Sequence, residues 1–306
     1  MDDFPRYDGD FPRWEESFRR VESHIKSTTD GFFGEDKKDR YVANFPLREN
    51  ILKLIVKEAY GRMPFNKEYV LKSYQRFHGG KPYLFYPARN AKKLIILVTG
   101  YVSYVSYNRF SWFFDEAEVW DRDIAYLFLC DPSRHWYVGK EGSDDLEIYS
   151  EIIYKTVESL EISKEDVYIV GASMGGYGAL VLGCKTSLGG VISVHPQLSF
   201  KSTLRYGHRL WAKKISECGV NFIDIDDLFA SSDIIPPIYL EVSRNSSDEF
   251  NLDNVIYELN KKNCVYTISR HASLVHETAS PSRAKIEAVI NFMELSKKLN
   301  SVDDVA

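Results

Sequence analysis

The stretch that decides the fold runs Val167-Tyr168-Ile169-Val170-Gly171-Ala172-Ser173-Met174-Gly175-Gly176-Tyr177-Gly178-Ala179-Leu180. Its first four residues are apolar and mostly β-branched, which predicts a buried strand. The small residues that follow predict a tight turn into a helix, because glycine lets the two elements approach closely. Ser173 stands at the centre of this turn, flanked at two residues on either side by Gly171 and Gly175. A serine in this context is raised above the sheet edge at a helix N-terminus, which makes Ser173 the candidate nucleophile.

Strands and helices alternate on both sides of this turn. Apolar runs predict strands at 82–86, 94–98, 124–130, 191–194, 237–242 and 264–269. Apolar residues at helical spacing predict helices at 146–160, 175–184, 204–218, 252–262 and 281–299. This alternation predicts an α/β fold with a mostly parallel central sheet and helices on both faces.

The N-terminal part of the chain follows a different pattern. We expect residues 1–68 to form an extension that is partly helical, with a helix over 47–59. A strand is predicted over 69–77, and the glycines of 78–81 predict a turn that sends the chain back as a hairpin.

The catalytic domain is expected to cover residues 69–306. Within it, the mixed segment 199–233 is the candidate for a small cap inserted over the carboxyl edge of the sheet. In the terminal helix, Ser280 is the expected N-cap and Pro281 the expected first residue.

Bulk composition excludes several classes of protein. The net charge is -5 and basic residues form no stripe, which argues against nucleic-acid binding. No apolar run approaches the roughly 20 residues of a membrane span, and the acidic N-terminus lacks the apolar region of a signal peptide. Cys130 and Cys184 are expected to be buried free thiols, since no Cys-x-x-Cys pair occurs. These features predict a cytoplasmic protein.

A serine nucleophile needs a base, and the base needs a carboxylate to orient it. The turn around Ser173 resembles that of the α/β-hydrolase superfamily, and this resemblance implies that the acid and then the histidine follow the serine along the chain. Asp248 lies in the loop after strand 237–242 and is the candidate acid. Glu249 and Asp253 are weaker candidates, because Asp253 is also placed to charge the first turn of the next helix.

Two histidines follow the last predicted strand. His276 is favoured as the base because it lies deeper in the loop, with room to fold back over the sheet edge. His271 is the alternative catalytic residue. No His-Glu-x-x-His motif or matching ligand cluster occurs, so no metal site is predicted.

Two backbone amides are candidates for an oxyanion hole. The N–H of Met174 follows the nucleophile, and the N–H of Tyr101 follows the apolar strand 94–98. Val102 is the next candidate in that loop. The alternative is that Gly100 makes an ordinary tight turn.

With the turn at 171–175, Gly100-Tyr101, Asp248 and His276, the chain resembles the α/β-hydrolase superfamily over residues 69–299. This resemblance implies acyl transfer through an acyl-enzyme, with no metal or organic cofactor. Common esterases of the superfamily have a histidine before the glycine of the oxyanion loop, where this chain has Thr99.

A narrower resemblance rests on three segments. They are Asp131-Pro132-Ser133-Arg134-His135-Trp136-Tyr137, Ser173-Met174-Gly175-Gly176-Tyr177 and His195-Pro196-Gln197. They are similar to α/β-hydrolase-fold proteins encoded with bacterial surface polysaccharides, some of which are O-acetyltransferases. His135 and His195 follow strand ends on the edge that holds the turn, so both are candidates for substrate contact.

Three functions remain open at this stage. The first is a serine esterase or deacylase acting on a small-molecule or glycan ester. The second is an O-acyltransferase that uses the same residues, with acetyl-CoA as acyl donor and a carbohydrate hydroxyl as acceptor. The third is a binding protein that keeps the fold without catalysis. Composition and motifs do not specify the oligomeric state.

Overall fold

The computed structural model of the chain describes residues 67–88, 90–113, 123–206, 209–244, 246–272 and 281–303. The helix predicted over 47–59 lies outside these ranges, as does all of the predicted extension 1–68 except its last two residues. Residues 70–110 and 121–306 group into one compact unit.

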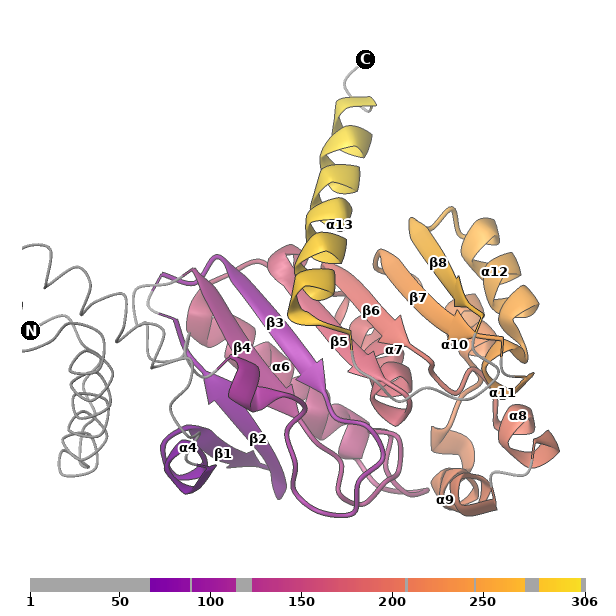
Figure 1. Ribbon diagram of the computed structural model, residues 1–306, viewed down its shortest axis with the longest axis horizontal. Helices are drawn as coiled ribbons and strands as arrows, with labels where there is room; N and C mark the ends of the chain where they lie inside the picture. The colour runs from indigo at the N-terminus through magenta and orange to yellow at the C-terminus, as the bar shows by residue number, and fades with distance from the viewer. Residues whose placement is uncertain are drawn as a thin grey trace, which may run out of the picture. The chain divides into compact units, whose positions relative to one another are not determined.

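In the described part of the chain, eight strands form one sheet in the order β1-β2-β4-β3-β5-β6-β7-β8 (Figure 1). The strands are β1 (Gln75–His78), β2 (Lys81–Tyr86), β3 (Lys93–Val98), β4 (Ile124–Leu129), β5 (Val167–Ala172), β6 (Gly190–Val194), β7 (Ile238–Ser243) and β8 (Tyr266–His271). Every neighbouring pair from β4 to β8 is parallel, whereas β2 is antiparallel to both β1 and β4. The mostly parallel sheet predicted from the sequence is confirmed.

Strands β1 and β2 form the expected hairpin. His78 pairs with Lys81, so the turn between them is Gly79-Gly80. Both glycines have positive φ, 53° and 74°, as a two-residue turn between right-twisted strands requires.

The strand predicted over 69–77 is wrong in its first part. Helix α4 covers Lys67–Tyr74, and only Gln75–His78 is extended. Glu68 and Lys72 lie one helical turn apart, with the acidic residue first and the basic residue last. That order favours a helix, and the weak alternation over 69–77 does not specify a strand in its first part.

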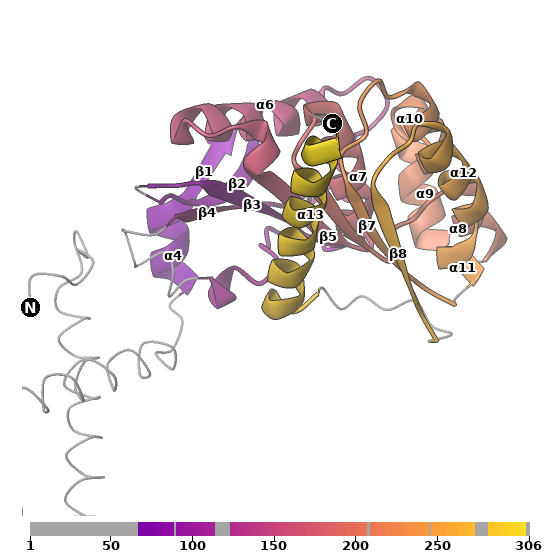
Figure 2. The same cartoon turned by 90° about the horizontal axis from the view of Figure 1, so that it is seen from above.

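Helices cover both faces of the sheet (Figure 2). Apart from α4, they are α6 (Asp145–Leu160), α7 (Met174–Thr186), α8 (Phe200–Arg205), α9 (Arg209–Cys218), α10 (Ile225–Ser231), α11 (Ser246–Glu249), α12 (Leu252–Lys261) and α13 (Arg283–Asp303). Gly183 of α7 packs against Val191 and Ile169, whereas Gly190 packs against Met293 of α13. Because adjacent strand residues point to opposite faces, α7 and α13 lie on opposite sides of β6.

Helix α13 begins two residues later than the sequence suggested. The side-chain oxygen of Ser282 accepts a hydrogen bond from the amide of Lys285 at 3.2 Å, which is the N-cap arrangement. The N-cap is therefore Ser282 rather than Ser280, and Pro281 precedes the helix.

Residues 199–233, the candidate cap, connect β6 to β7. The helix predicted over 204–218 is replaced by α8 and α9, followed by a short 3-10 helix (Gly219–Asn221) and α10. The amide group of Asn221 donates to the carbonyls of Val138 and Lys140, which ties this segment to the loop after β4. Among the described helices, none combines the length and the apolarity that a bilayer crossing requires.

Candidate active site

Ser173 occupies a strained backbone conformation between β5 and α7. Its φ is 54° and its ψ is -124°, a region that L-residues with a side chain rarely adopt. Backbone hydrogen bonds hold it there: its amide donates to Val194 at 2.8 Å, and its carbonyl accepts from Gly176 and Tyr177. Strain of this kind costs on the order of 1–3 kcal/mol and clusters at functional sites.

The glycines around Ser173 are required by close packing. A Cβ on Gly171 would lie 1.9 Å from the carbonyl oxygen of Gly175, and one on Gly175 would lie 2.5 Å from that of Val98. A side chain at either position would push β5, α7 and β3 apart. Glycine at these two positions therefore lets β5, α7 and β3 pack closely, and this packing places Ser173 at the sheet edge.

Two buried side chains that were not among the predicted site residues form a chain of contacts to the candidate nucleophile Ser173. Gln197, in the loop after β6, directs its Nε2 toward the Oγ of Ser173 at 3.4 Å. The indole Nε1 of Trp136 donates to the Oε1 of Gln197 at 2.9 Å. Both residues lie in segments quoted for the narrower resemblance, but nothing in the sequence indicates that they meet.

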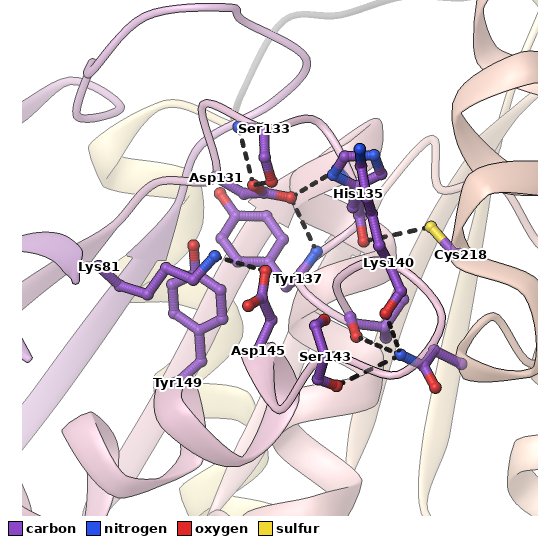
Figure 3. Close-up of polar contacts among 12 residues, drawn as sticks. Lys81, Asp131, Ser133, His135, Tyr137, Lys140, Ser143, Asp145, Tyr149 and Cys218 are labelled. Carbon is purple, nitrogen blue, oxygen red and sulfur yellow. Dashed lines mark hydrogen bonds and ion pairs between the residues drawn. The ribbon is translucent and has the colours of Figure 1, made fainter. Parts of the chain in front are cut away.

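The loop over residues 131–137, which contains Trp136, is organised around a buried carboxylate. Figure 3 shows this carboxylate, that of Asp131, with its contacts to Ser133, His135 and Tyr137. Oδ2 of Asp131 accepts the backbone amides of His135 at 2.7 Å and Tyr137 at 3.2 Å, and Oδ1 accepts that of Ser133 at 3.1 Å. These bonds allow Trp136 and Tyr137 to adopt positive φ, 53° and 64°. Asp131 is therefore a structural carboxylate.

Asp248, the candidate acid, lies in α11 after β7 and is only 2% exposed. The hydroxyl of Ser243 donates to its Oδ2 at 2.5 Å, and the hydroxyl of Ser247 donates to Oδ1 at 3.4 Å. His195 Nδ1 lies 3.4 Å from the same Oδ2. Of the weaker candidates, Asp253 is exposed in the first turn of α12.

The structure places the two candidate histidines differently. His271 is the last residue of β8 rather than a residue beyond it, and its Nε2 lies 2.7 Å from Oε1 of Glu241. Glu241 also pairs with the ammonium group of Lys285. His276 lies outside the described residues.

His135 and His195 are both buried, which leaves neither ring on the surface. His135 Nε2 is 2.9 Å from Oε2 of Glu217 in α9, and that contact lowers the pKa of Glu217 to about 2, with Lys214 adding to the effect. The ring of His195 meets that of His271 edge-on at 5.9 Å.

Met174 and Tyr101 are the two candidates for the oxyanion hole. Met174 is the first residue of α7, where amides have no partner within the helix. Tyr101 follows β3, and its ring lies 5.6 Å from that of Trp136. Thr99 takes a structural role there, because its hydroxyl donates to the Ser106 carbonyl at 2.9 Å. Across the residues that the structure describes, no group of three or more His, Cys, Asp or Glu could hold a metal ion.

No protein-family model and no curated protein sequence matches the chain. Solved structures do. The capsule O-acetyltransferase of Neisseria meningitidis serogroup A superposes with a TM-score of 0.55 at 18% identity, over 71% of this chain and 93% of that one. FphF, a fluorophosphonate-binding serine hydrolase of Staphylococcus aureus, superposes with a TM-score of 0.50 at 16% identity, over 70% and 92%. The chain has the α/β-hydrolase fold.

The α/β-hydrolase fold predicted from the turn at 171–175 is thus confirmed. In this fold the nucleophile, acid and histidine follow one another along the chain. Here Ser173 follows β5, Asp248 follows β7, and the segment after β8 contains His276.

Proposed function

We propose that this α/β-hydrolase-fold chain is a serine hydrolase that cleaves a carboxylic ester through an acyl-enzyme on Ser173. The strained backbone of Ser173 carries the proposal. An ordinary turn between β5 and α7 has no need of a serine at φ 54°, whereas a nucleophile presented above the sheet edge does. The buried carboxylate of Asp248, in α11 after β7, supplies the orienting charge.

In acylation, Oγ of Ser173 bonds to the ester carbonyl carbon while its proton passes to the imidazole of His276. The carbonyl π electrons move onto oxygen, and the amides of Met174 and Tyr101 donate to that oxyanion. The intermediate then collapses, the ester C–O bond breaks, and the leaving alcohol takes the proton from the imidazolium. Asp248 holds the imidazole and stabilises its positive charge.

In deacylation the same groups act on water. The imidazole removes a proton from water, whose oxygen bonds to the acyl carbon. When this second intermediate collapses, the bond to Oγ breaks and Ser173 recovers its proton from the imidazolium. The acid is released and the enzyme is regenerated without a cofactor.

Acyl transfer is the second candidate function. The superposition on a capsule O-acetyltransferase is the observation that favours it, since that protein's acceptor is not water. A second structure of that acetyltransferase, a variant in complex with CoA, superposes with a TM-score of 0.50 at 19% identity over 74% of this chain and 93% of that one. Under this alternative, acetyl-CoA is the donor and a carbohydrate hydroxyl replaces water.

A fluorophosphonate probe tests the nucleophile, with p-nitrophenyl acetate turnover followed in the same samples. Ser173→Ala is expected to abolish labelling and turnover. Ser187→Ala is the matched control, since Ser187 caps the other end of α7 with a similar φ of 53°. Labelling that survives in Ser173→Ala would assign the reactive nucleophile to another residue and reject the mechanism. A folded wild type that is not labelled would favour a binding protein.

The base and the acceptor are tested separately. His276→Ala is expected to abolish turnover and His271→Ala to retain most of it, because Glu241 engages His271. The opposite result would assign the base to His271. Incubation with acetyl-CoA and oligosaccharides, read by mass spectrometry, distinguishes acetylated glycan from free acetate.

A further inference from the structure

We propose that Gln197 is a catalytic hydrogen-bond donor to the nucleophile oxygen itself, and that Trp136 is the residue that positions it. This assignment rests on the proposed function of Ser173. The role of Gln197 differs from that of the backbone amides of the oxyanion hole, which donate to the carbonyl oxygen of the substrate. Gln197 instead faces the oxygen that forms and breaks the covalent bond.

The backbone holds Gln197 close to the nucleophile. The backbone amide of Ser173 donates to the carbonyl of Val194 at 2.8 Å. The backbone amide of His195, the residue after Val194, donates to the backbone carbonyl of Glu241 at 2.7 Å. The end of β6 is therefore tied to β5 on one side and to β7 on the other. Gln197 follows two residues later, is only 4% exposed, and brings its Nε2 to 3.4 Å from Oγ of Ser173.

Trp136 decides which end of the Gln197 amide faces Ser173. An indole N–H can only donate, so the group that it meets at 2.9 Å must be the carbonyl Oε1. The NH2 group is thereby turned toward Oγ. Trp136 is fully buried in the loop that the Asp131 carboxylate organises, so this orientation is set before substrate binds.

The donor acts on charge at Oγ. The hydroxyl of Ser173 donates its proton to the base and accepts from Gln197. In deacylation the bond between the acyl carbon and Oγ breaks, and the electron pair returns to Oγ before the imidazolium protonates it. A preorganised N–H aimed at this leaving oxygen stabilises the charge, and Gln197 itself neither gains nor loses a proton.

Deacylation should therefore depend on Gln197 more than acylation does. Gln197→Met keeps the length of the side chain and removes the donor, and Trp136→Phe keeps a buried ring and removes the orienting N–H. Both variants are expected to lower steady-state turnover of p-nitrophenyl acetate by about 10- to 100-fold, at or below the usual loss for an oxyanion donor. The pre-steady-state burst of p-nitrophenol should persist, because the acyl-enzyme accumulates.

Tyr149→Phe is the matched control. Tyr149 is a fully buried aromatic residue whose hydroxyl donates to the Cys130 carbonyl at 2.8 Å, beside the same loop. It is expected to lose stability without changing the ratio of burst rate to steady-state rate. If Gln197→Met does not fold, Gln197→Glu keeps its volume, presents an acceptor to Oγ, and should slow turnover at least as much.

Equal burst and steady-state losses, or turnover within about twofold of wild type, in a folded Gln197 variant would overturn the assignment and leave the proposed function standing. Failure of the wild type to react with the fluorophosphonate would overturn both. A selective loss of steady-state turnover in the Gln197 and Trp136 variants, absent from Tyr149→Phe, would support it.

Discussion

Gly171→Ala should deform the nucleophile's turn. The added Cβ would lie 1.9 Å from the carbonyl oxygen of Gly175, 2.3 Å from its carbonyl carbon and 2.9 Å from the amide of Gly176. All three atoms belong to the backbone, so no side-chain rotation can relieve the overlap. Overpacking costs typically 1–3 kcal/mol, and we expect a value near the upper end, about 3 kcal/mol.

That loss converts to a measurable change in melting temperature. Each kcal/mol shifts Tm by roughly 2–4 °C in a domain of about 200 residues, so Gly171→Ala should lower Tm by roughly 6–12 °C. Differential scanning calorimetry measures the shift, and the rate of fluorophosphonate labelling reports the geometry of Ser173. We expect labelling to slow by at least about tenfold at temperatures where the variant is folded, because a 1 Å displacement can cost up to about a hundredfold.

Gly100→Ala is the control for this experiment. Its Cβ would lie 3.4 Å from the carbonyl of Ala172, an ordinary van der Waals distance, so Tm should change little. A Gly171→Ala variant with the Tm and labelling rate of the wild type would refute the argument that close packing of β5 and α7 positions the serine. Equal losses of Tm and labelling rate in Gly171→Ala and Gly100→Ala would show that the effect is not specific to Gly171.

Three further predictions concern other parts of the molecule. Burial raises the pKa of Cys130, Cys184 and Cys218 to about 12. A thiol reagent at pH 8 should therefore modify the partly exposed Cys264 first, and Cys264→Ser should remove the fast phase of modification. The pKa of Glu217 is lowered to about 2, so its carboxylate stabilises the fold above its unfolded pKa of about 4.3, and this contribution is lost as the pH falls toward 2. The Tm difference between wild type and Glu217→Gln should therefore narrow between about pH 6 and pH 3. A Tm difference that stays constant over this range would contradict the prediction. Asp248→Asn should keep the fold and lower turnover by about a thousandfold or more, because an amide no longer orients the basic imidazole correctly, and retention of turnover would exclude Asp248 as the acid.

Local sequence patterns were sufficient to predict the sheet and the tight turn around Ser173. Apolar runs mark buried parallel strands, since such strands are covered on both faces. Glycines on both sides of Ser173 mark a place where backbones nearly touch, and the distances at Gly171 and Gly175 bear this out. Asp248 was selected as the candidate acid by counting strands, because the α/β-hydrolase fold places the acid in a loop at the carboxyl edge of the sheet, and its role stays a prediction. Over α4 the apolar pattern is too short to distinguish a helix from a strand, and the predicted strand is wrong there.

The contacts around the nucleophile were decided only by the tertiary structure. Trp136 and Gln197 are 61 residues apart in sequence, and they meet because one follows β4 and the other follows β6 in the same sheet. That loop depends on positive φ at Trp136, stabilised by the carboxylate of Asp131. The sequence by itself determined which serine lies at the turn, because that depends on neighbours along the chain. Which side chains face its oxygen depends on strand order and loop conformation, and these are properties of the folded molecule alone.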